Sequence, residues 1–358
     1  MFLILNGGMN KINRFFKANN NNPLIIAEIS GNHQKSLTIS KKIIDKVAES
    51  GAQMVKFQTF DPEEMTVNLK KKIFQITNKK NIWYGKYYYE LYKRSHLSYD
   101  LTKELFEYSY SKNLTPFSSV FDLKSLEFLE KINCKLYKIA SFENTDHVLI
   151  KNVAMTKKPI IISSGLASER ELDMTINLIK KYGSSKIILL KCTSNYPAKF
   201  KDLNLKTISD MKKKYAIKIG FSDHTIGSTA AIVSIGQGSE VIEKHICLKK
   251  GIGIDSKFSL TTKDLKVFVN DCKNAYSSIG KIFYGPTKNE KQITKGSRSL
   301  YYNGDFTKGS RLEISDFKRC RPGYGIKVYL LNKIINKKLL KNVKFGDPTK
   351  LSDFFTSK

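Results

Sequence analysis

The sequence has few acidic residues, and this shortage bears on which partners the protein can have. Only 32 Asp and Glu stand against 62 Lys and Arg in 358 residues, a net charge of +30. A basic excess of this size attracts phosphate backbones of any sequence. The lysines, however, are spread over nearly every helix-like segment, and arginine is scarce. A nucleic-acid binder concentrates its charge on one face, so we interpret the excess as a solvated surface that helps draw in anionic substrates, and we expect no nucleic-acid partner.

Cysteines and long apolar runs are also in short supply. The chain has five cysteines, an odd number with no C-x-x-C pair: Cys134, Cys192, Cys247, Cys272 and Cys320. Because most of them fall in apolar runs, they indicate buried thiols in a reducing cytoplasm. No apolar stretch approaches the length of a membrane span, and MFLIL at the start is too short for a signal-peptide core. The sequence therefore predicts a cytoplasmic protein with no membrane partner.

Strand-like runs that alternate with helix-like segments are the most regular feature of the chain. Eight short β-rich runs occupy residues 24–30, 53–58, 114–119, 136–141, 159–164, 186–192, 218–223 and 240–246. Segments with apolar residues at three- and four-residue spacing lie between and after them, among them 36–50, 99–112, 169–183 and 262–280. Eight strand–helix repeats in about 250 residues are typical of a (β/α)8 TIM barrel, an α/β fold.

The length of the chain favours one large domain followed by a small one. We expect a flexible N-terminal extension over residues 1–22 and a barrel over 23–280. A linker over 281–297 and a small C-terminal domain over 298–358 complete the predicted organisation.

The barrel fold predicts where a site lies, because active sites of this fold gather at the carboxyl ends of the strands. Polar residues end every predicted strand: Glu28 and Ser30, Lys56 and Gln58, Ser118 and Ser119, Lys138 and Ser141, Ser163 and Ser164, Lys191 and Thr193, Ser222 to His224, and Glu243 to His245. A single residue of this kind is more often a satisfied rim residue than a catalytic one. Eight sets in the same relative place favour a functional site.

The residue types at these strand ends suit metal-assisted phosphate chemistry. His224 and His245 end neighbouring strands, so their imidazoles can converge on one divalent cation, although two histidines alone are a weak metal signal. Lys56 and Lys138, with several Ser hydroxyls, form a plausible cradle for a phosphate group. Glu28 is a candidate general acid or base, and the alternative is a plain salt bridge to a barrel lysine.

Seven segments resemble, in order and spacing, the motifs of the sialic acid synthase family. They are IIAEISGNH, MVKFQTF, YKIASFE, IISSG, KCTSNYP, GFSDHTIG and EKHICL. The resemblance runs from about residue 23 to residue 355, and it implies condensation of phosphoenolpyruvate with an amino-sugar aldehyde. Residues 298–356 are similar to the antifreeze-like, or SAF, domain that ends these synthases. That similarity implies a domain-swapped homodimer in which this domain leans over the partner's barrel.

The resemblance also assigns roles to individual residues. It implies that His224 and His245 bind a divalent metal, Mn²⁺ or Mg²⁺, that polarises the sugar aldehyde. The residues that would hold phosphoenolpyruvate are Lys56, Lys138, Ser141, Ser163, Ser194 and Ser222. The residues that would face the sugar are Gln58, Tyr196, Asp255 and, from the other subunit, the partner's Arg321. Glu28, with Lys56 and Lys138, would be catalytic, and Glu28 would help to deprotonate the water that adds to C2 of phosphoenolpyruvate.

Three segments are similar to the pseudaminic branch of this family: NIWYGKYYYELYKRSH, IDSKFSL and CTSNYP. They imply a diacetamido-trideoxy hexose as substrate, 2,4-diacetamido-2,4,6-trideoxy-L-altrose. The chain departs from the family pattern in SGNH for SANH, in SSVF for SSPF, and in Ser194, which is Asn in sialic acid synthases. A sialic or legionaminic sugar therefore remains an alternative. A basic binding protein on an inactive barrel is a remote one.

Overall fold

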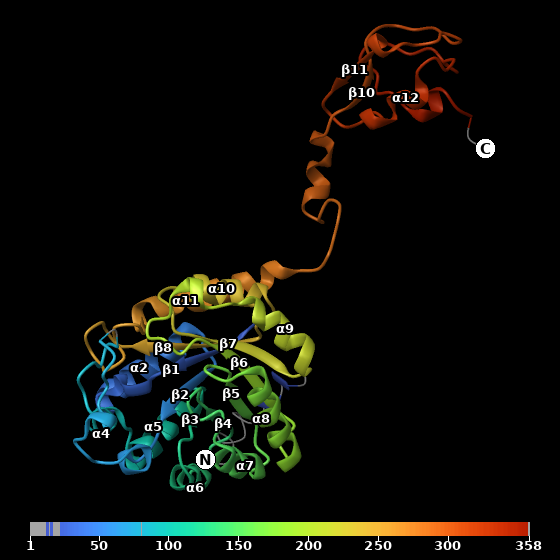
Figure 1. The fold of residues 1–358 in the computed structure, drawn as a ribbon. Helices are drawn as coiled ribbons and strands as arrows, with labels where there is room; N and C mark the ends of the chain where they lie inside the picture. Colours follow the sequence, from blue (N-terminus) through green and yellow to red (C-terminus); the bar gives the residue numbers. More distant parts are fainter. Residues whose placement is uncertain (1–11, 14, 17–21, 80, 357–358) are drawn as a thin grey trace. The chain divides into compact units, whose positions relative to one another are not determined.

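The computed structural model describes residues 12–13, 15–16, 22–79 and 81–356. Eight parallel strands pair in chain order, and β8 also pairs with β1, which closes them into a barrel inside a ring of helices (Figure 1). The strands are β1 Leu24–Glu28, β2 Met54–Gln58, β3 Thr115–Ser119, β4 Tyr137–Ile139, β5 Ile160–Ser163, β6 Ile187–Cys192, β7 Lys218–Asp223 and β8 Val241–Cys247. The predicted (β/α)8 barrel is confirmed, and each strand lies within one residue of its predicted run or inside it.

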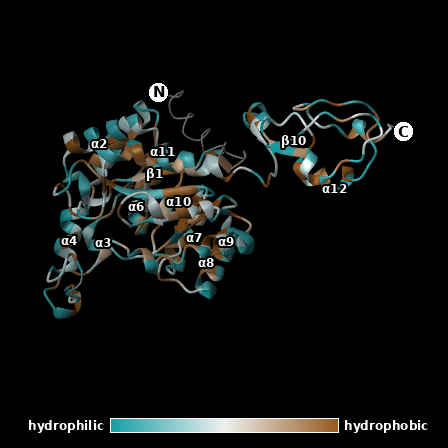
Figure 2. Cartoon of the chain, turned by 90° about the horizontal axis from the view of Figure 1, so that it is seen from above, coloured by the Kyte–Doolittle hydropathy of each residue, from teal (hydrophilic) through white to brown (hydrophobic). Residues whose placement is uncertain are grey.

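The helices of the barrel unit are α2 Leu37–Ser50, α3 Pro62–Met65, α4 Tyr88–Ser95, α5 Tyr99–Ser111, α6 Leu123–Lys131, α7 His147–Met155, α8 Glu169–Tyr182, α9 Lys206–Tyr215, α10 Thr229–Gly236 and α11 Thr262–Ile279. The longer helices bury apolar residues against the strands and place polar residues outward, whereas α4 has no buried residue. In α2, the Ser36 side chain accepts from the Ile39 amide at the start, and Gly51 ends the helix with a φ of 82°. Figure 2 shows both residue classes along these helices. None of the described helices is long and apolar enough to cross a membrane.

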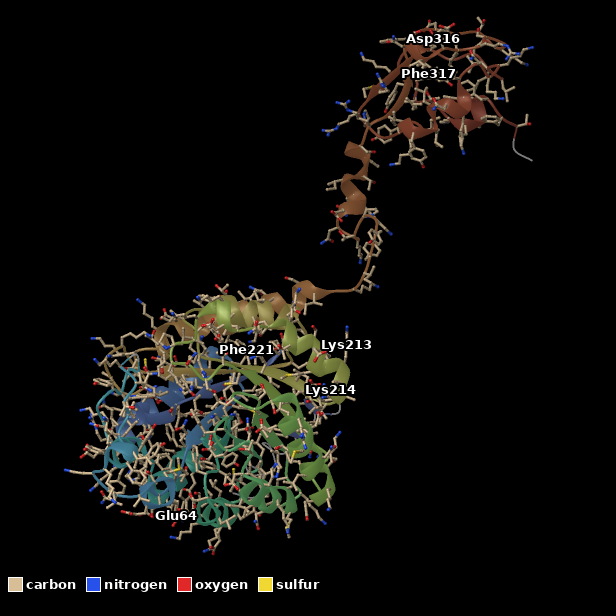
Figure 3. The ribbon with its side chains drawn as sticks, in the orientation of Figure 1. Glu64, Lys213, Lys214, Phe221, Asp316 and Phe317 are labelled. Atoms are coloured by element: carbon tan, nitrogen blue, oxygen red, sulfur yellow. The ribbon has the colours of Figure 1, made fainter. Side chains whose placement is uncertain are left out.

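Alternation along the strands decides which side chains face the barrel interior. In β8, Glu243 and His245 contact residues of other strands inside the barrel, as described below. Lys244 between them faces outward, and its Nζ lies 5.5 Å from the centre of the Phe268 ring in α11. In β7, Ser222 contacts Glu243 inside the barrel. Its neighbour Phe221 therefore lies on the opposite, outer face of the strand, where it is fully buried (Figure 3). Polar residues two positions apart therefore reach one interior space.

A ninth strand, β9 Leu260–Thr261, pairs in parallel with the end of β8. The sequence did not predict it. A two-residue strand carries no periodicity of its own, and this pairing exists because the loop after β8 returns to the last residues of that strand. The loop residue Asp255 is thereby held beside the mouth of the barrel, where its contacts are described below.

Part of the predicted N-terminal extension packs on the barrel. Ile12 and Phe15 are 5% and 6% exposed and belong to the barrel core. Lys186 donates to the side chain of Asn13 at 2.6 Å, and the Nζ of Lys218 lies 5.3 Å from the centre of the Phe15 ring. Both lysines lie at the amino ends of strands, so this segment covers the end of the barrel opposite the predicted site. The other residues of 1–21 lie outside the described residues. The flexibility predicted for this extension therefore stays a prediction.

The chain divides into two compact units between Gly280 and Lys281, where the sequence predicts the end of the barrel. The second unit has its own antiparallel strands, β10 Ser299–Tyr302 and β11 Phe317–Cys320, and a short helix, α12 Leu331–Ile334. Its core is a separate cluster of Leu300, Tyr302, Leu312, Phe317, Ile334, Leu339, Val343 and Phe354. The unit therefore carries its own hydrophobic core.

Candidate active site

Two lysines and two glutamates form a buried charge cluster at the carboxyl end of the barrel. Lys56 Nζ lies 2.9 Å from Glu28 Oε2 and 3.5 Å from Glu243 Oε1. Lys138 Nζ lies 3.8 Å from the same Glu243 oxygen and donates to Ser163 Oγ at 2.7 Å. The charged side chains are at most 3% exposed. Buried charges of both signs that converge in this way are costly to assemble, which favours function over stability as their reason.

The two carboxylates of this cluster have pKa values that are pushed apart. Burial raises the pKa of Glu28 to about 7, with Lys56 as a partial offset. Burial acts on Glu243 in the same direction, but Lys138 and Lys56 outweigh it and hold the pKa of Glu243 below its usual value. Glu243 is therefore a fixed negative charge, whereas Glu28 can exchange a proton near neutral pH. Glu28 does form a salt bridge to a barrel lysine, the alternative to a catalytic role. Its raised pKa nevertheless allows it to act as a base.

Serine hydroxyls surround the lysine ammonium groups. Lys56 donates to Ser119 Oγ at 3.3 Å, and Ser222 Oγ donates to Glu243 at 3.1 Å. The predicted phosphate-binding residues of strands β2, β4, β5 and β7 thus lie in one network with Glu243 at its centre. Such a cluster of ammonium and hydroxyl donors suits an anion with several oxygens.

Two further predicted serines meet over Gly165, in the loop after β5. A Cβ on Gly165 would lie 2.4 Å from the hydroxyl of Ser194 and 2.5 Å from that of Ser141. Any larger residue would therefore displace both hydroxyls. The side chain of Asn144 fixes this loop by donating to the carbonyls of Ser163 and Gly165 at 3.1 and 2.8 Å.

The two histidines lie side by side, with ring centres 5.2 Å apart. His224 Nδ1 faces the carbonyl of Thr193 at 3.0 Å, a contact that requires the proton on Nδ1 and, in the neutral imidazole, leaves the lone pair on Nε2. Burial acts to lower the pKa of His224, but the neighbouring Cys192 outweighs it and holds that pKa above its usual value. His245 Nδ1 is buried and makes no hydrogen bond within the described residues. Burial holds the pKa of His245 well below its usual value, so this imidazole is neutral, as a metal ligand must be.

The donor set fits an open metal site rather than a closed one. The described residues contain no group of three or more His, Cys, Asp or Glu that could hold a metal ion. A cation on His224 and His245 would therefore take its other ligands from water and substrate. Catalytic sites leave positions open in this way, whereas structural sites do not.

Aromatic side chains line the wall next to the histidines. The Tyr196 ring lies 4.4 Å from His224 and 5.0 Å from Phe258, measured between ring centres. Trp83, in the segment before α4, lies 6.1 Å from Tyr196. The indole Nε1 of Trp83 is buried and has no hydrogen-bond partner among the described residues. This wall offers apolar faces and an unused donor, which suits a sugar with acetamido groups.

The other residues predicted to face a sugar lie in different surroundings. Asp255 is 6% exposed and accepts hydrogen bonds from Ser30 Oγ at 2.5 Å and from the Gly31 amide at 3.2 Å. Gln58 donates to Glu28 Oε1 at 2.8 Å and so lies directly beside the candidate base.

Arg321 belongs to the C-terminal unit, and the structure describes it only within that unit. It is exposed, on a loop that is fixed at several points. Ser299 Oγ and Tyr301 OH donate to the Pro322 carbonyl at 2.8 and 2.6 Å, and the Gly323 amide donates to Lys295 O at 2.7 Å. The loop therefore presents the guanidinium from a rigid base.

Sequence reasoning missed two acidic residues of this site. Glu243 was recognised as polar but was given no role, although its spacing of two from His245 places it on the same face of β8. Glu143 belongs to the YKIASFE motif and has a buried Oε2 without a hydrogen-bond partner among the described residues. Burial raises its pKa to about 7, with Lys138 as a partial offset. The YKIASFE motif, which ends in Glu143, was the sequence feature that could have indicated this residue.

Known proteins are similar to this chain over most of its length. The sequence profile of the NeuB family matches residues 43–284. A pseudaminic acid synthase of Helicobacter pylori is 38% identical over 335 residues, 92% of this chain and 97% of that protein. One of Campylobacter jejuni is 36% identical over 334 residues, 92% of this chain and 96% of that protein. The solved N-acetylneuraminic acid (sialic acid) synthetase of Leptospira borgpetersenii, in complex with citrate, has a TM-score of 0.67 and 31% identity, covering 76% of this chain and 91% of that one.

Proposed function

The chain belongs to the NeuB family, the family of the sialic acid synthases, and we propose that it is an enzyme that condenses phosphoenolpyruvate with 2,4-diacetamido-2,4,6-trideoxy-L-altrose. The products are a nine-carbon nonulosonic acid, pseudaminic acid, and phosphate. One observation carries this proposal above the others: the buried cluster of Glu28, Lys56, Lys138 and Glu243 lies at the same barrel end as the paired histidines.

The cluster supports binding of phosphoenolpyruvate at its lysines. Lys56 and Lys138 would neutralise its phosphate and carboxylate groups, while the hydroxyls of Ser163 and Ser222 donate to oxygens at one end and those of Ser141 and Ser194 at the other. The net charge of +30 supports rapid capture of such an anion. Glu243 keeps the two ammonium groups in place before the substrate arrives.

The reaction forms one carbon–carbon bond and one carbon–oxygen bond, and it breaks the carbon–oxygen bond to phosphate. C3 of phosphoenolpyruvate attacks the aldehyde carbon of the open-chain sugar, water adds to C2, and the resulting tetrahedral intermediate loses phosphate. Glu28 takes the proton from the attacking water, as its raised pKa permits. When bound at His224 and His245, a divalent metal, Mn²⁺ or Mg²⁺, supplies Lewis-acid polarisation of the aldehyde oxygen.

The diacetamido sugar is favoured by the relatives and by the aromatic wall. The two pseudaminic acid synthases cover nearly the whole chain at 36% and 38% identity. Trp83 offers an unused buried donor beside Tyr196, in the segment that resembles the pseudaminic branch. The competing candidates are the sialic and legionaminic sugars, for which the same cluster would serve unchanged.

An assay with a panel of sugars tests the substrate. We expect phosphate release from phosphoenolpyruvate with the diacetamido altrose at a kcat/KM at least about tenfold above that with N-acetylmannosamine, whose single acetamido group leaves a buried donor unpaired. We expect the same preference over the legionaminic precursor, whose two acetamido groups stand on a sugar of different stereochemistry and so meet the donors in a different geometry. Each reaction is run with Mn²⁺ and with Mg²⁺. Preference for another sugar would reassign the branch, and no phosphate release with any sugar would overturn the synthase proposal.

The pKa of Glu28 predicts the acidic limb of the pH profile. Below about pH 7 the carboxyl is protonated and cannot accept a proton from water, so kcat/KM should fall about tenfold per pH unit below that value and level off above it. Glu143 has a pKa of about 7 as well, so Glu143→Gln is the discriminating variant. The limb should persist in Glu143→Gln. An active Glu143→Gln enzyme that lacks the limb would transfer the titrating role from Glu28 to Glu143.

The rim of the barrel supports assembly with a second copy. Apolar side chains on the loops after β4 to β7 are largely exposed: Phe142 67%, Leu166 70%, Phe200 56% and Ile226 62%. Leu166 also has a φ of 69°, which is strained for a leucine and is tolerated mainly at functional positions. Such an apolar arc around a site mouth is typical of a covered surface.

We propose that the occupant of this arc is the C-terminal unit of a second chain, in a domain-swapped homodimer. That unit exposes aromatic residues of its own, namely Tyr324, Tyr329 and Phe345 at 59%, 79% and 62%. Its resemblance to the SAF domain supports the same role, with the partner's Arg321 facing the sugar.

The five free cysteines, four of them buried, suit a cytoplasmic enzyme.

A further inference from the structure

A buried ion pair lies directly behind the two histidines, on the outer face of the barrel. Asp223 and Lys244 are register partners in the β7–β8 ladder, and Lys244 Nζ lies 2.8 Å from Asp223 Oδ2. Both residues are 1% exposed. Asp223 immediately precedes His224, and Lys244 immediately precedes His245. The pair therefore joins the two strands one residue before each imidazole turns into the barrel.

The pair also makes hydrogen bonds to Thr225, the residue that follows His224. Asp223 Oδ1 accepts from the amide of Thr225 at 2.8 Å and from its hydroxyl at 2.7 Å. Lys244 Nζ donates to the Thr225 carbonyl at 2.6 Å. The backbone of His224 is thus held on both sides by groups that are bonded to Lys244, the neighbour of His245.

Stability alone does not account for this pair. Removing both charges from water is costly, and replacing a buried ion pair by uncharged side chains of similar volume is often neutral or stabilising. A barrel that needed only a filled space beneath α11 would be served by apolar side chains. What apolar side chains would not supply is the set of three directional hydrogen bonds to Thr225 and the ion pair that links their partners.

We propose that Asp223 and Lys244 are positioning residues that set the separation and orientation of His224 and His245 for metal binding. The inference rests on the proposed function, because it takes the two histidines as metal ligands. Ligand-supporting contacts of this kind typically change metal affinity by about 10- to 100-fold when they are removed. The effect should therefore fall on metal affinity far more than on folding.

The test is the D223N/K244M double variant of the full chain, titrated with Mn²⁺ alone by calorimetry or by electron paramagnetic resonance. Asn keeps an oxygen that can accept from Thr225, and Met fills the space of the lysine stem, so neither charge is left unpaired. We expect near-native circular dichroism and melting temperature, with a Kd for Mn²⁺ that is 10- to 100-fold weaker.

A second ion pair on the same strands provides the matched control. Lys218 Nζ lies 2.5 Å from Glu240 Oε2 at the amino ends of β7 and β8, away from the histidines. K218M/E240Q should leave the Kd for Mn²⁺ unchanged. If D223N/K244M does not fold, D223E keeps the charge but moves the carboxylate, and it should weaken Mn²⁺ binding as well. Wild-type affinity in a folded D223N/K244M or D223E variant overturns this inference alone, whereas a wild-type chain that binds no Mn²⁺ overturns the metal site with it.

Discussion

Replacing His224 or His245 by alanine should abolish turnover while the barrel remains folded. Each imidazole would supply one of only two protein ligands to the metal, and metal polarisation of a carbonyl contributes several kcal/mol, which is about a thousandfold in rate or more. Neither side chain belongs to the hydrophobic core cluster. Phosphate release is measured after chelator treatment and resupply of Mn²⁺ or Mg²⁺, and circular dichroism reports the fold.

The control for this experiment is His147→Ala. His147 starts α7, and among the described residues its Nε2 makes a long contact of 3.4 Å to Thr175 Oγ1. This variant should keep wild-type turnover. That result would show that the loss of turnover in His224→Ala and His245→Ala does not follow from removing just any imidazole. Chelation should stop the wild-type enzyme, and resupplied metal should restore it. Near-normal turnover of either His224→Ala or His245→Ala under these conditions would contradict the two-histidine site.

The fold was largely readable from the sequence because parallel barrel strands are buried on both faces. Such strands appear as short apolar runs, and polar residues begin where the strands open into the site. The run 218–223 coincides with β7, and 186–192 exceeds β6 by one residue. The short strand β9 was not readable in the same way, because its two residues gain their partner only through the fold of the preceding loop.

The site was readable only as far as strand position determines it. Alternation and strand ends indicate Glu28, His224 and His245, since Glu28 ends β1, His224 directly follows β7, and His245 lies in the last three residues of β8. The role of Glu243 depends on Lys56 from β2 and Lys138 from β4, which approach it only when the barrel closes. Its lowered pKa likewise arises from these long-range charges. No local pattern in EVIEKHI contains that information.

Arg321→Ala should impair use of the sugar far more than use of phosphoenolpyruvate. A guanidinium is suited to an acetamido carbonyl, and loss of a hydrogen bond to a charged group costs about 1.5–3 kcal/mol, so kcat/KM for the sugar should fall by about 10- to 150-fold. Lys318→Ala removes one positive charge from the same unit at an exposed position of β11. It should leave kcat/KM unchanged for both the sugar and phosphoenolpyruvate. Equal effects on both substrates would argue against a sugar contact.

Mixed dimers should show that Arg321 acts on the barrel of the other chain. In a dimer of one Arg321→Ala chain and one Glu28→Ala chain, the first barrel keeps its own Glu28 and receives an intact Arg321 from its neighbour. Activity at a sugar concentration well below the wild-type KM should therefore rise above that of either parent, toward half of the wild-type value per mixed dimer. The reciprocal mixture pairs wild type with a chain that carries both substitutions, and there the wild-type barrel loses its partner's arginine and should fall to the level of Arg321→Ala. If the arginine served its own chain, the first mixture would gain nothing and the second would keep one fully active barrel, because both substitutions would then disable the same site.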